Sequence, residues 1–394
     1  MELARVKNVA NRWLYLEDDT FIDVVLATVV AHGFGGDPLW LMLVAPSGSG
    51  KTEFLRALSG ERIYHLSNLT PQALVSGLKQ RKGDPSVLPE INGKVMVVKD
   101  LTTLLSENAK DRTKIFGQLR DLYDGFTSKA FGSGAGKRSY ACHIGFVAGV
   151  TPAVERYQAM DQALGERFLN YRMEPPDPDR HVEKAMENAG CQREMRHELE
   201  RAVHEFLHHD WPTSADSVSL PKAVQAKIMD LAVATAQLRT QVPKTRAGVI
   251  SFVPEPEVGT RLAIQLTNLG RALAIVRGTS VVGESEYEVL RKVARDSLPS
   301  VRLRLLSAVL EVSGPSRGFV DTAALAERSR IPLLSTRAGL EDLRLLRLAE
   351  STKSNPIRWR LSEALCQRLS STGIVLSEKQ FGLSVVQMEG GVRS

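Results

Sequence analysis

The segment from Ala45 to Thr52 constrains this chain more than any other, because it reads A-P-S-G-S-G-K-T between a predicted strand and a predicted helix. The apolar run at 39–44 precedes it, and residues 53–58, which favour helix, follow it. A strand, a glycine-rich loop, Lys-Thr and a helix in this order are typical of a P-loop, in which backbone N–H groups surround a phosphate chain. We therefore expect a phosphate-binding turn here.

The residues of this loop have predicted parts in binding ATP and Mg²⁺. Two glycines let the backbone curl so that its N–H groups point at phosphate oxygens, and the new helix adds the positive end of its dipole. Lys51 is expected to reach the β- and γ-phosphates, and Thr52 to place its hydroxyl on Mg²⁺. The usual leading glycine is replaced by Ala45. The predicted phosphate-binding set is Pro46, Ser47, Gly48, Ser49, Gly50, Lys51 and Thr52.

Composition is that of a soluble globular protein. The 394 residues predict two or three domains, and 43% hydrophobic with 24% charged residues is ordinary for such chains. No apolar run reaches the length of a membrane span, and no N-terminal segment resembles a signal peptide. The scattered cysteines 142, 191 and 366 favour neither a disulfide framework nor a metal site, so we expect a cytoplasmic location. The net charge of +6 permits a nucleic-acid partner without requiring one.

The pattern of strands and helices divides the chain. Strands predicted at 39–44, 63–66, 94–98 and 143–150 alternate with helices at 19–32 and 110–123, which favours an α/β core with a doubly wound parallel sheet over residues 1–175. Residues 176–297 follow a proline-rich break and read as an all-α domain. Residues 298–369 are predicted to form a third domain, and 370–394 a partly ordered tail.

Three further residues are candidates for the same site. Asp100 ends the apolar strand V-M-V-V-K-D and would hold Mg²⁺ directly or through water; the alternative is an Asp that only caps the next turn. Thr151 follows another apolar strand, and strand carboxyl ends line the ligand crevice of such sheets, so it is expected near the γ-phosphate or the attacking water. Arg167 either reaches a neighbour's nucleotide or forms a surface ion pair.

The order of these motifs resembles that of AAA+ ATPases, and is most similar to the branch of the minichromosome maintenance helicases and related phage and mobile-element ATPases. In this resemblance residues 45–52 are Walker A, 95–100 are Walker B, Thr151 occupies the sensor-1 position and Arg167 is the arginine finger. Residues 259–262, G-T-R-L, resemble the start of the sensor-2 helix of a helical lid, with Arg261 as a γ-phosphate contact. The resemblance covers roughly residues 20–365. It implies a ring or filament of this chain, with a hexamer expected.

The chain departs from that family at Walker B. AAA+ ATPases usually follow the Asp with a Glu that orients the attacking water, whereas this chain has Lys99-Asp100-Leu101. Either Asp100 is the Mg²⁺ ligand and the water is handled elsewhere, or the register is shifted and Asp100 does the work of the Glu. Glu90 is a remote candidate that nothing in the sequence places. We therefore expect ATP hydrolysis that stays slow until the protein oligomerises or meets nucleic acid.

Residues 128–140 hold the first candidate contacts with DNA. Two short arms flank a glycine-rich tip, and Lys129, Lys137 and Arg138 lie beside it, which predicts a β-hairpin. Its position resembles the pre-sensor-1 hairpin that projects into the pore of minichromosome-maintenance-like hexamers, where basic residues would follow a phosphate backbone. The alternative is a flexible solvated loop.

The C-terminal quarter holds the second set of candidates. Helices predicted at 302–312, 321–328 and 335–347, followed by an extended basic hairpin at 348–361, indicate a winged helix-turn-helix. Residues 301–394 carry fourteen Lys and Arg against nine Asp and Glu, a net charge of +5. Ser335, Thr336 and Arg337 are expected at base edges, and Lys353, Arg358 and Arg360 at phosphate or the minor groove. The alternative is a protein-binding module, and Trp359 is either core or a stacking surface.

Two functions account for all of these motifs. The first is an ATP-dependent DNA helicase, initiator or helicase loader, in which Arg167 completes a neighbour's site. The second is a DNA-bound regulator of transcription or transposition in which ATP only sets the oligomeric state. A small-molecule phosphotransferase is a weaker third hypothesis, because it leaves the helical domain, Arg167 and the winged helix without a role.

Overall fold

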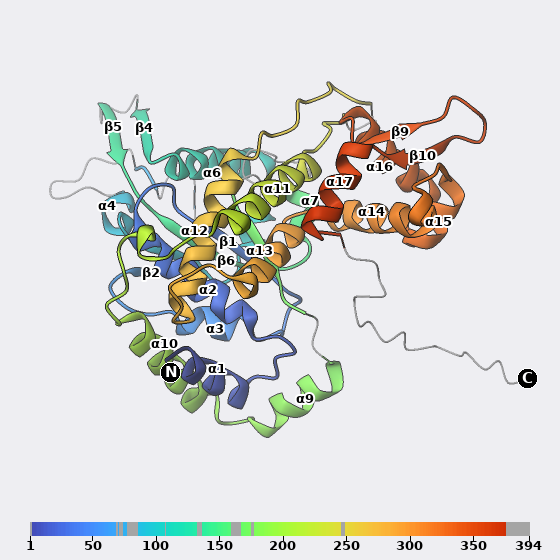
Figure 1. Cartoon of the computed structure of the whole chain (residues 1–394). Coiled ribbons are helices and arrows are strands. Elements are labelled where there is room, and N and C mark those ends of the chain that lie inside the picture. Colours follow the sequence, from blue (N-terminus) through green and yellow to red (C-terminus); the bar gives the residue numbers. More distant parts are fainter. Residues whose placement is uncertain are drawn as a thin grey trace, which may run out of the picture. The chain divides into compact units, whose positions relative to one another are not determined.

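The computed structural model describes residues 2–67, 70, 74–76, 86–106, 108–131, 136–158, 167–174, 177–245 and 249–375. These residues form two compact units. Unit 1 contains the described residues of 1–236 and 258–297, and unit 2 those of 237–257 and 298–375. Figure 1 traces both units along the chain. The predicted tail lies outside the described residues from position 376 onward.

Unit 1 is built on a five-stranded parallel sheet in the order β2-β3-β6-β1-β7. The parallel sheet confirms the prediction, and β7 is a fifth strand that the sequence did not reveal, because its alternating L-N-Y-R carries two polar residues. Strands β1, β3 and β6 are buried along their whole length, as expected of strands covered on both faces. The strands are β1 (Trp40–Val44), β2 (Ile63–Leu66), β3 (Val95–Val98), β6 (Gly145–Val150) and β7 (Leu169–Arg172).

Helices cover both faces of this sheet. Side chains alternate between the faces along each strand, so Trp40, Met42 and Val44 of β1 share one core with α5 and α6. On the other face lie α2 and α3, where Phe21 and Phe54 meet edge to face with centroids 5.2 Å apart. The first helices of the chain are α1 (Glu2–Trp13), α2 (Thr20–Ala31), α3 (Lys51–Ala57), α4 (Leu88–Ile91), α5 (Thr102–Leu105), α6 (Ala109–Tyr123) and α7 (Val154–Gln158).

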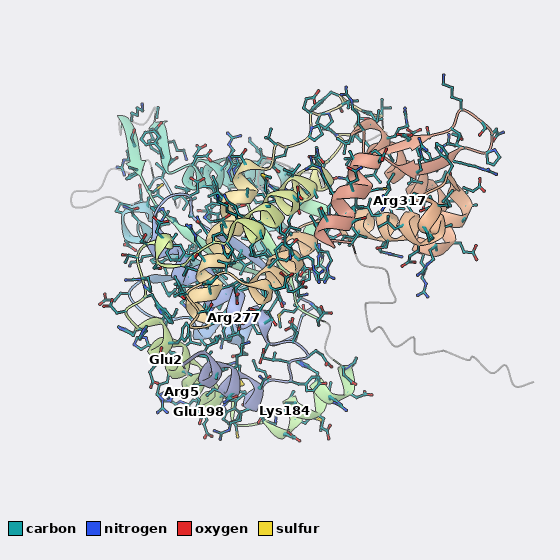
Figure 2. All side chains as sticks on the ribbon, in the orientation of Figure 1. Glu2, Arg5, Lys184, Glu198, Arg277 and Arg317 are labelled. Atoms are coloured by element: carbon teal, nitrogen blue, oxygen red, sulfur yellow. The ribbon has the colours of Figure 1, made fainter. Side chains whose placement is uncertain are left out.

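Apart from residues 237–257, the predicted helical region belongs to the same compact unit as the sheet. Arg277 at the end of α12 joins three helices, since its guanidinium donates to Asp23 of α2 at 2.9 Å and to Glu286 of α13 at 3.1 Å (Figure 2). Asp23 is buried and also pairs with Lys7 of α1 at 2.6 Å. These helices are α9 (Pro178–Glu187), α10 (Gln192–Leu207), α11 (Lys222–Arg239), α12 (Thr260–Val276) and α13 (Glu284–Asp296).

The predicted hairpin at 128–140 is confirmed in its two arms. Strands β4 (Phe126–Phe131) and β5 (Gly136–Ala141) pair antiparallel and follow α6, apart from the main sheet (Figure 1). Thr127 is buried and the Tyr140 hydroxyl lies 2.9 Å from Ser86 Oγ, so one face of the hairpin rests on unit 1. Its tip at 132–135 lies outside the described residues.

Unit 2 combines helices with a three-stranded antiparallel sheet in the order β8-β10-β9. Trp359 of β10 is buried and its indole N–H donates to Thr322 Oγ1 at 2.8 Å, which identifies it as core. Arg302 is buried as well, and burial lowers its pKa to about 10. Its guanidinium donates to the carbonyls of Leu238 and Thr240 at 2.6 and 2.5 Å, and so fastens residues 237–257 to α14. The elements are α14 (Ser300–Ser313), β8 (Val320–Asp321), α15 (Thr322–Ser329), α16 (Leu333–Leu345), β9 (Ala349–Ser351), β10 (Arg358–Leu361) and α17 (Glu363–Thr372).

His32 gives the fold of unit 1 a measurable pH dependence. Its ring is buried and stacks on His143 with centroids 4.3 Å apart. Burial, helped by the nearby His143 and Arg62, lowers the pKa of His32 from 6.5 to about 4. The neutral ring therefore stabilises the fold fully above pH 6.5, and this contribution is lost as the pH falls through the range from 6.5 to 4. About 3 kcal/mol of the free energy of unfolding should disappear over that range.

Denaturant unfolding between pH 7 and pH 4 measures this effect. The variant His32→Gln should show a correspondingly shallower pH dependence, because its side chain does not titrate. His208→Gln, at an exposed histidine, is the matched control and should keep the dependence of the unaltered protein. Equal pH dependence in the two variants contradicts the assignment to His32.

Candidate functional site

The loop at 45–52 turns sharply between β1 and α3. Gly48 and Gly50 have φ angles of +84° and +82°, in the left-handed region that glycine adopts without strain. A Cβ on Gly48 would meet nothing within 4 Å, so the backbone conformation rather than crowding requires glycine there. Helix α3 begins at Lys51, directly after Gly50. The loop therefore ends at a helix N-terminus, where backbone N–H groups are available to an anion.

Two polar side chains of this loop are buried in it. Lys51 is 5% exposed and its Nζ donates to the carbonyl of Pro46 at 3.1 Å. Burial lowers the pKa of Lys51, and the Asp100 carboxylate acts against that shift. Ser49 is 4% exposed, and its hydroxyl has no hydrogen-bond partner among the described residues. A buried hydroxyl of this kind fits a site whose partner is a ligand.

Backbone contacts bring the ends of three strands to one place. The N–H of Ala45 donates to Val150 O at 3.1 Å, and that of Leu101 to Gly149 O at 2.8 Å. Segments that follow β1, β3 and β6 therefore meet at the carboxyl edge of the sheet. This is where the structure brings together the P-loop, Asp100 and Thr151, as strand order alone led us to expect.

Asp100 and Thr151 are joined by a residue that the sequence did not reveal. Asp100 is exposed, and its Oδ1 accepts a hydrogen bond from the N–H of Thr102 at 2.9 Å. The Thr102 hydroxyl in turn accepts from the N–H of Thr151 at 3.1 Å. The Asp100 carboxylate thus caps the next turn, as the alternative interpretation of the sequence predicted. It does so at the carboxyl edge of the sheet, which also carries Lys51. A threonine two residues after an Asp does not indicate a site residue in the sequence, because this pattern is typical of the start of a helix.

A cavity of about 340 Å³ adjoins the P-loop, which is within the size range of ligand sites. Its walls come from the end of α1, from α9 and from the start of α10. The indole N–H of Trp13 donates to Glu198 of α10 at 2.7 Å, and Asn188 donates to the carbonyl of Trp13 at 2.9 Å (Figure 2 labels Glu198). The lining residues outside the loop are Trp13, Leu14, Tyr15, His181, Lys184, Ala185, Asn188, Gln192 and Met195.

The cavity also touches the loop directly. His181 Nε2 lies 2.5 Å from the carbonyl of Gly48, and because a carbonyl only accepts, this nitrogen carries the proton. Arg196 holds Glu53, the residue after Thr52, through two hydrogen bonds of 2.8 and 3.0 Å. More than 120 residues separate these partners in sequence. No local pattern could have indicated that α9 and α10 close the site.

These features fit the groups of a nucleoside triphosphate with Mg²⁺. The buried Ser49 hydroxyl and the open space beside Gly48 suit phosphates, and the largely apolar cavity suits a base. Thr52 and Asp100 supply hydroxyl and carboxylate oxygens, which Mg²⁺ prefers. Within the described residues no group of three or more His, Cys, Asp or Glu side chains is able to hold a metal, so such an ion would need phosphate or water oxygens as well.

Arg167 and Arg261 lie together at the opposite edge of the sheet. Arg167 lies two residues before the start of β7, and the guanidinium groups of Arg167 and Arg261 lie over the ring of Tyr123, at 5.6 and 5.8 Å from its centroid. Tyr123 packs edge-on against Trp40, the first residue of β1. Gln265 of α12 donates to the Tyr123 hydroxyl and to the carbonyl of Arg167, which anchors the start of α12 at this edge.

This arrangement corrects the expectation for Arg261. The strands of a parallel sheet begin at one edge and end at the other, so Arg261 is held at the far edge from the P-loop of its own chain. It is therefore not part of a γ-phosphate contact set with Asp100 and Thr151 within one chain. Arg167 is 6% exposed and pairs with Asp124 at 3.0 Å, which is the ion pair of the alternative interpretation. Its neighbours at 164–166 lie outside the described residues.

Glu90 also lies away from the carboxyl edge. It is on α4, which directly precedes β3, and it accepts a hydrogen bond from the hydroxyl of Tyr64 at 3.3 Å. Tyr64 belongs to β2 and lies beside Met96 of β3. Glu90 is therefore at the edge where β3 begins, so it does not supply the carboxylate missing after Asp100.

The basic residues of the hairpin fall on two faces. Lys129 lies directly opposite Arg138, and both are half-buried on the face that carries Thr127. Lys137 pairs with Ala130 and is exposed on the other face. The alternation of a strand separates them in this way, so the structure does not bring all three cations to one surface.

The candidate contacts of unit 2 also divide. Thr336 is fully buried and its hydroxyl donates to the carbonyl of Ile331 at 3.1 Å, so the expectation that it meets base edges is wrong. Ser335 and Arg337 are exposed beside it, as is Lys353 in the loop between β9 and β10. Arg358 and Arg360 are also exposed, but they pair with Asp321 at 3.2 Å and with Glu350 at 2.7 Å.

Comparison with models of protein families and with curated proteins finds no match to this chain. Among the described residues, no helix has both the length and the apolar character needed to cross a membrane. The site is therefore interpreted from its own geometry.

Gly149 is the position at which the carboxyl edge is most easily disturbed. A Cβ there would lie 2.5 Å from the carbonyl oxygen of Lys99 and 3.0 Å from a methyl of Leu55. Because the first of these is backbone, Gly149→Ala should force apart the segments that carry Asp100 and Thr151. We expect a loss of about 2 kcal/mol in the free energy of unfolding, measured by urea denaturation.

Gly117→Ala is the matched control. Gly117 lies inside α6, and an added Cβ there meets nothing within 4 Å. This substitution should raise the free energy of unfolding by about 0.5–1 kcal/mol, because alanine loses less conformational entropy in a helix. A Gly149→Ala variant as stable as the unaltered protein would show that the two segments are not in close contact.

Proposed function

We propose that this chain is an ATP-binding and ATP-hydrolysing protein of the AAA+ type that acts on DNA as an oligomer. The observation that carries the proposal is the loop at 45–52, in which the buried Lys51 lies in the field of Asp100 at the carboxyl edge of a parallel sheet. Backbone N–H groups and Lys51 would hold the phosphates, and Thr52 with Asp100 would hold Mg²⁺. Bound Mg²⁺ would neutralise charge that develops on the phosphates.

The carboxylates at the carboxyl edge support slow hydrolysis. Asp100 is already engaged by the N–H of Thr102, and Glu90 is at the other edge. Glu155 of α7 follows Thr151 but is held by Arg172 at 2.7 Å. A general base must come within hydrogen-bond reach of the attacking water, so the positioning of these carboxylates limits the rate in the isolated chain.

The pair Arg167 and Arg261 supports action on a neighbouring subunit. Two guanidinium groups held over one tyrosine ring, at the edge remote from their own P-loop, are suited to meet the triphosphate of a second copy. Asp124 would have to release Arg167 for this contact. An oligomer would therefore couple assembly to the presence of ATP, as the resemblance to AAA+ rings implies.

Two regions support contact with DNA. The hairpin β4–β5 presents Lys137 on its outer face, and the helix order and antiparallel strands of unit 2 are compatible with the proposed winged helix-turn-helix, with Arg337 and Lys353 exposed. Exposed cations such as Lys137 and Lys353 would bind phosphates without reading sequence, whereas an arginine at the front of α16 can also reach base edges. In this proposal Ser335 and Arg337 are the remaining candidates for base contacts, and helicase, initiator and loader stay as alternatives within the proposal.

The second candidate function is an ATP-gated regulator without motor activity. Leu333 and Leu334 at the start of α16 are 53% and 82% exposed, and the wing arginines are engaged by carboxylates. Exposed leucines at that place favour a protein partner over a DNA groove. A strand-displacement assay separates the two functions, because only a motor unwinds a duplex.

The substitution Lys51→Ala tests nucleotide binding. It removes the charged donor expected at the β- and γ-phosphates, so ATP affinity should fall about 10- to 100-fold and hydrolysis should be lost. Calorimetric titration with ATP and a phosphate-release assay measure both. Lys114→Ala, at an exposed lysine on α6, is the control and should behave as the unaltered protein. Unchanged ATP binding by Lys51→Ala would remove the P-loop assignment.

Mixing two inactive variants tests completion of the site by a neighbour. Arg167→Ala keeps an intact P-loop, and Lys51→Ala keeps intact arginines. If Arg167 acts on a neighbour's nucleotide, each variant alone should be inactive, and an equimolar mixture should regain a fraction of the ATPase rate on the order of a quarter. Arg167→Ala should bind ATP as the unaltered protein does. No recovery in a mixture that co-assembles, as judged by sedimentation, counts against the shared site.

Salt dependence of binding tests the DNA contacts of unit 2. The double variant Arg337→Ala with Lys353→Ala should lower the slope of log affinity against log salt by about 1 to 2 on duplex DNA, because each phosphate contact contributes about 0.9 and Arg337 contributes to the slope only where it meets a phosphate. Arg358→Ala with Arg360→Ala is the matched pair and should change the slope less, since Asp321 and Glu350 already engage these side chains. If neither pair changes the slope, unit 2 does not bind DNA and the regulator with a protein partner gains support.

A further inference from the structure

Thr102 lies between Asp100 and Thr151, the two side chains assigned to the outer end of the triphosphate. It belongs to neither β3 nor β6, the strands that these two residues follow. It is the first residue of α5. Its backbone N–H donates to Asp100 Oδ1 at 2.9 Å, and its Oγ1 accepts from the N–H of Thr151 at 3.1 Å. One residue therefore ties the segment after β3 to the segment after β6.

The hydroxyls of Thr102 and Thr151 also form a pair. Their oxygens are 3.4 Å apart, within hydrogen-bond distance. A hydroxyl has a single proton, so a bond between the two uses one proton and leaves the other for an acceptor outside the pair. This holds whichever of the two is the donor. The pair therefore offers one O–H at the carboxyl edge, where a phosphate oxygen or the attacking water would accept it.

The surroundings hold this pair in place. Gly149 carries no side chain, which lets the backbone of Lys99 approach β6, and the N–H of Leu101 donates to Gly149 O at 2.8 Å. The chain from Lys99 to Thr102 is thus fixed against β6 at both ends of Asp100. A shift of Thr151 toward a ligand would be transmitted through Thr102 to the Asp100 carboxylate, because the same residue bonds to both.

We propose that Thr102 is a positioning residue that couples the Asp100 carboxylate to the hydroxyl of Thr151, so that the site distinguishes ATP from ADP. This inference rests on the proposed function of ATP binding and hydrolysis. Thr102 does not itself need to touch the nucleotide. It sets where the Thr151 hydroxyl points and keeps Asp100 Oδ1 in place while the γ-phosphate is present.

The test compares Thr102→Val with Thr102→Ser. Valine has the shape of threonine without the hydroxyl, and it keeps the backbone N–H that bonds to Asp100. We expect Thr102→Val to lower kcat about tenfold and the ratio of ATP to ADP affinity about tenfold, with the KM for ATP rising as ATP affinity falls, while ADP affinity changes less than about twofold. Thr102→Ser restores the hydroxyl and should lie within about threefold of the unaltered protein in both quantities.

A double variant shows whether the two hydroxyls act as one unit. If Thr102 acts through Thr151, Thr102→Val combined with Thr151→Val should lose no more activity than Thr151→Val alone. Losses that multiply would show that the two residues act independently. Thr113→Val, at an exposed threonine of α6 whose hydroxyl bonds within its own helix, is the control and should change nothing.

The outcomes separate this inference from the proposed function. An unaltered chain that binds no nucleotide overturns both, whereas one that binds ATP and ADP alike overturns this inference and leaves the proposed function standing. An unaltered chain that prefers ATP, together with a folded Thr102→Val variant of unchanged preference and kcat, overturns the role of Thr102 alone. A Thr102→Ser variant as impaired as the valine variant also overturns it, because the methyl group rather than the hydroxyl would then matter. Thr102→Ala replaces the valine variant in this comparison if thermal melting shows the latter unfolded.

Discussion

The parallel pairing of β1 with β6 and β7 is the constraint on which the site depends. In a parallel sheet all carboxyl ends lie at one edge, so the P-loop after β1 meets the segments that follow β3 and β6. The missing side chain at Gly149 then lets the backbone at Lys99 close onto β6. The segments that carry Lys51, Asp100 and Thr151 are brought together by backbone hydrogen bonds, and the Asp100 carboxylate then acts on the charge of Lys51.

The common direction of the strands also explains why Arg167 and Arg261 lie at the edge of the sheet opposite the loop at 45–52. Arg167 enters β7 at the edge where strands begin, and α12 is anchored there through Gln265 and the ring of Tyr123. A single chain therefore keeps its phosphate loop and its candidate finger at opposite edges of one sheet. In the proposed oligomer, a site shared between two copies would reconcile these positions, and assembly would have to exchange the ion pair of Arg167 with Asp124.

Carboxylates moderate the basic character of unit 2. Its sequence carries a net charge of +5 over residues 301–394. However, Arg358 and Arg360 form ion pairs with carboxylates, and Arg302 is buried and donates to a backbone carbonyl of residues 237–257. Among the described residues of unit 2, Arg337 and Lys353 are exposed cations away from these ion pairs. Net charge counts residues, whereas binding depends on which cations lie at the surface without a carboxylate beside them.

The sequence determined the elements of this protein and the tertiary structure decided which of them meet. Local patterns were enough to predict the glycine-rich turn between β1 and α3, the parallel sheet, the arms of the hairpin and the helices α14, α15 and α16, because hydrophobic periodicity and glycine positions act over a few residues. They did not reveal β7, the cavity wall of α9 and α10 or the bridging role of Thr102, and they misplaced Thr336 and Arg261. Those properties depend on contacts between segments that are distant in sequence, and on which side of a helix or edge of a sheet a residue finally faces.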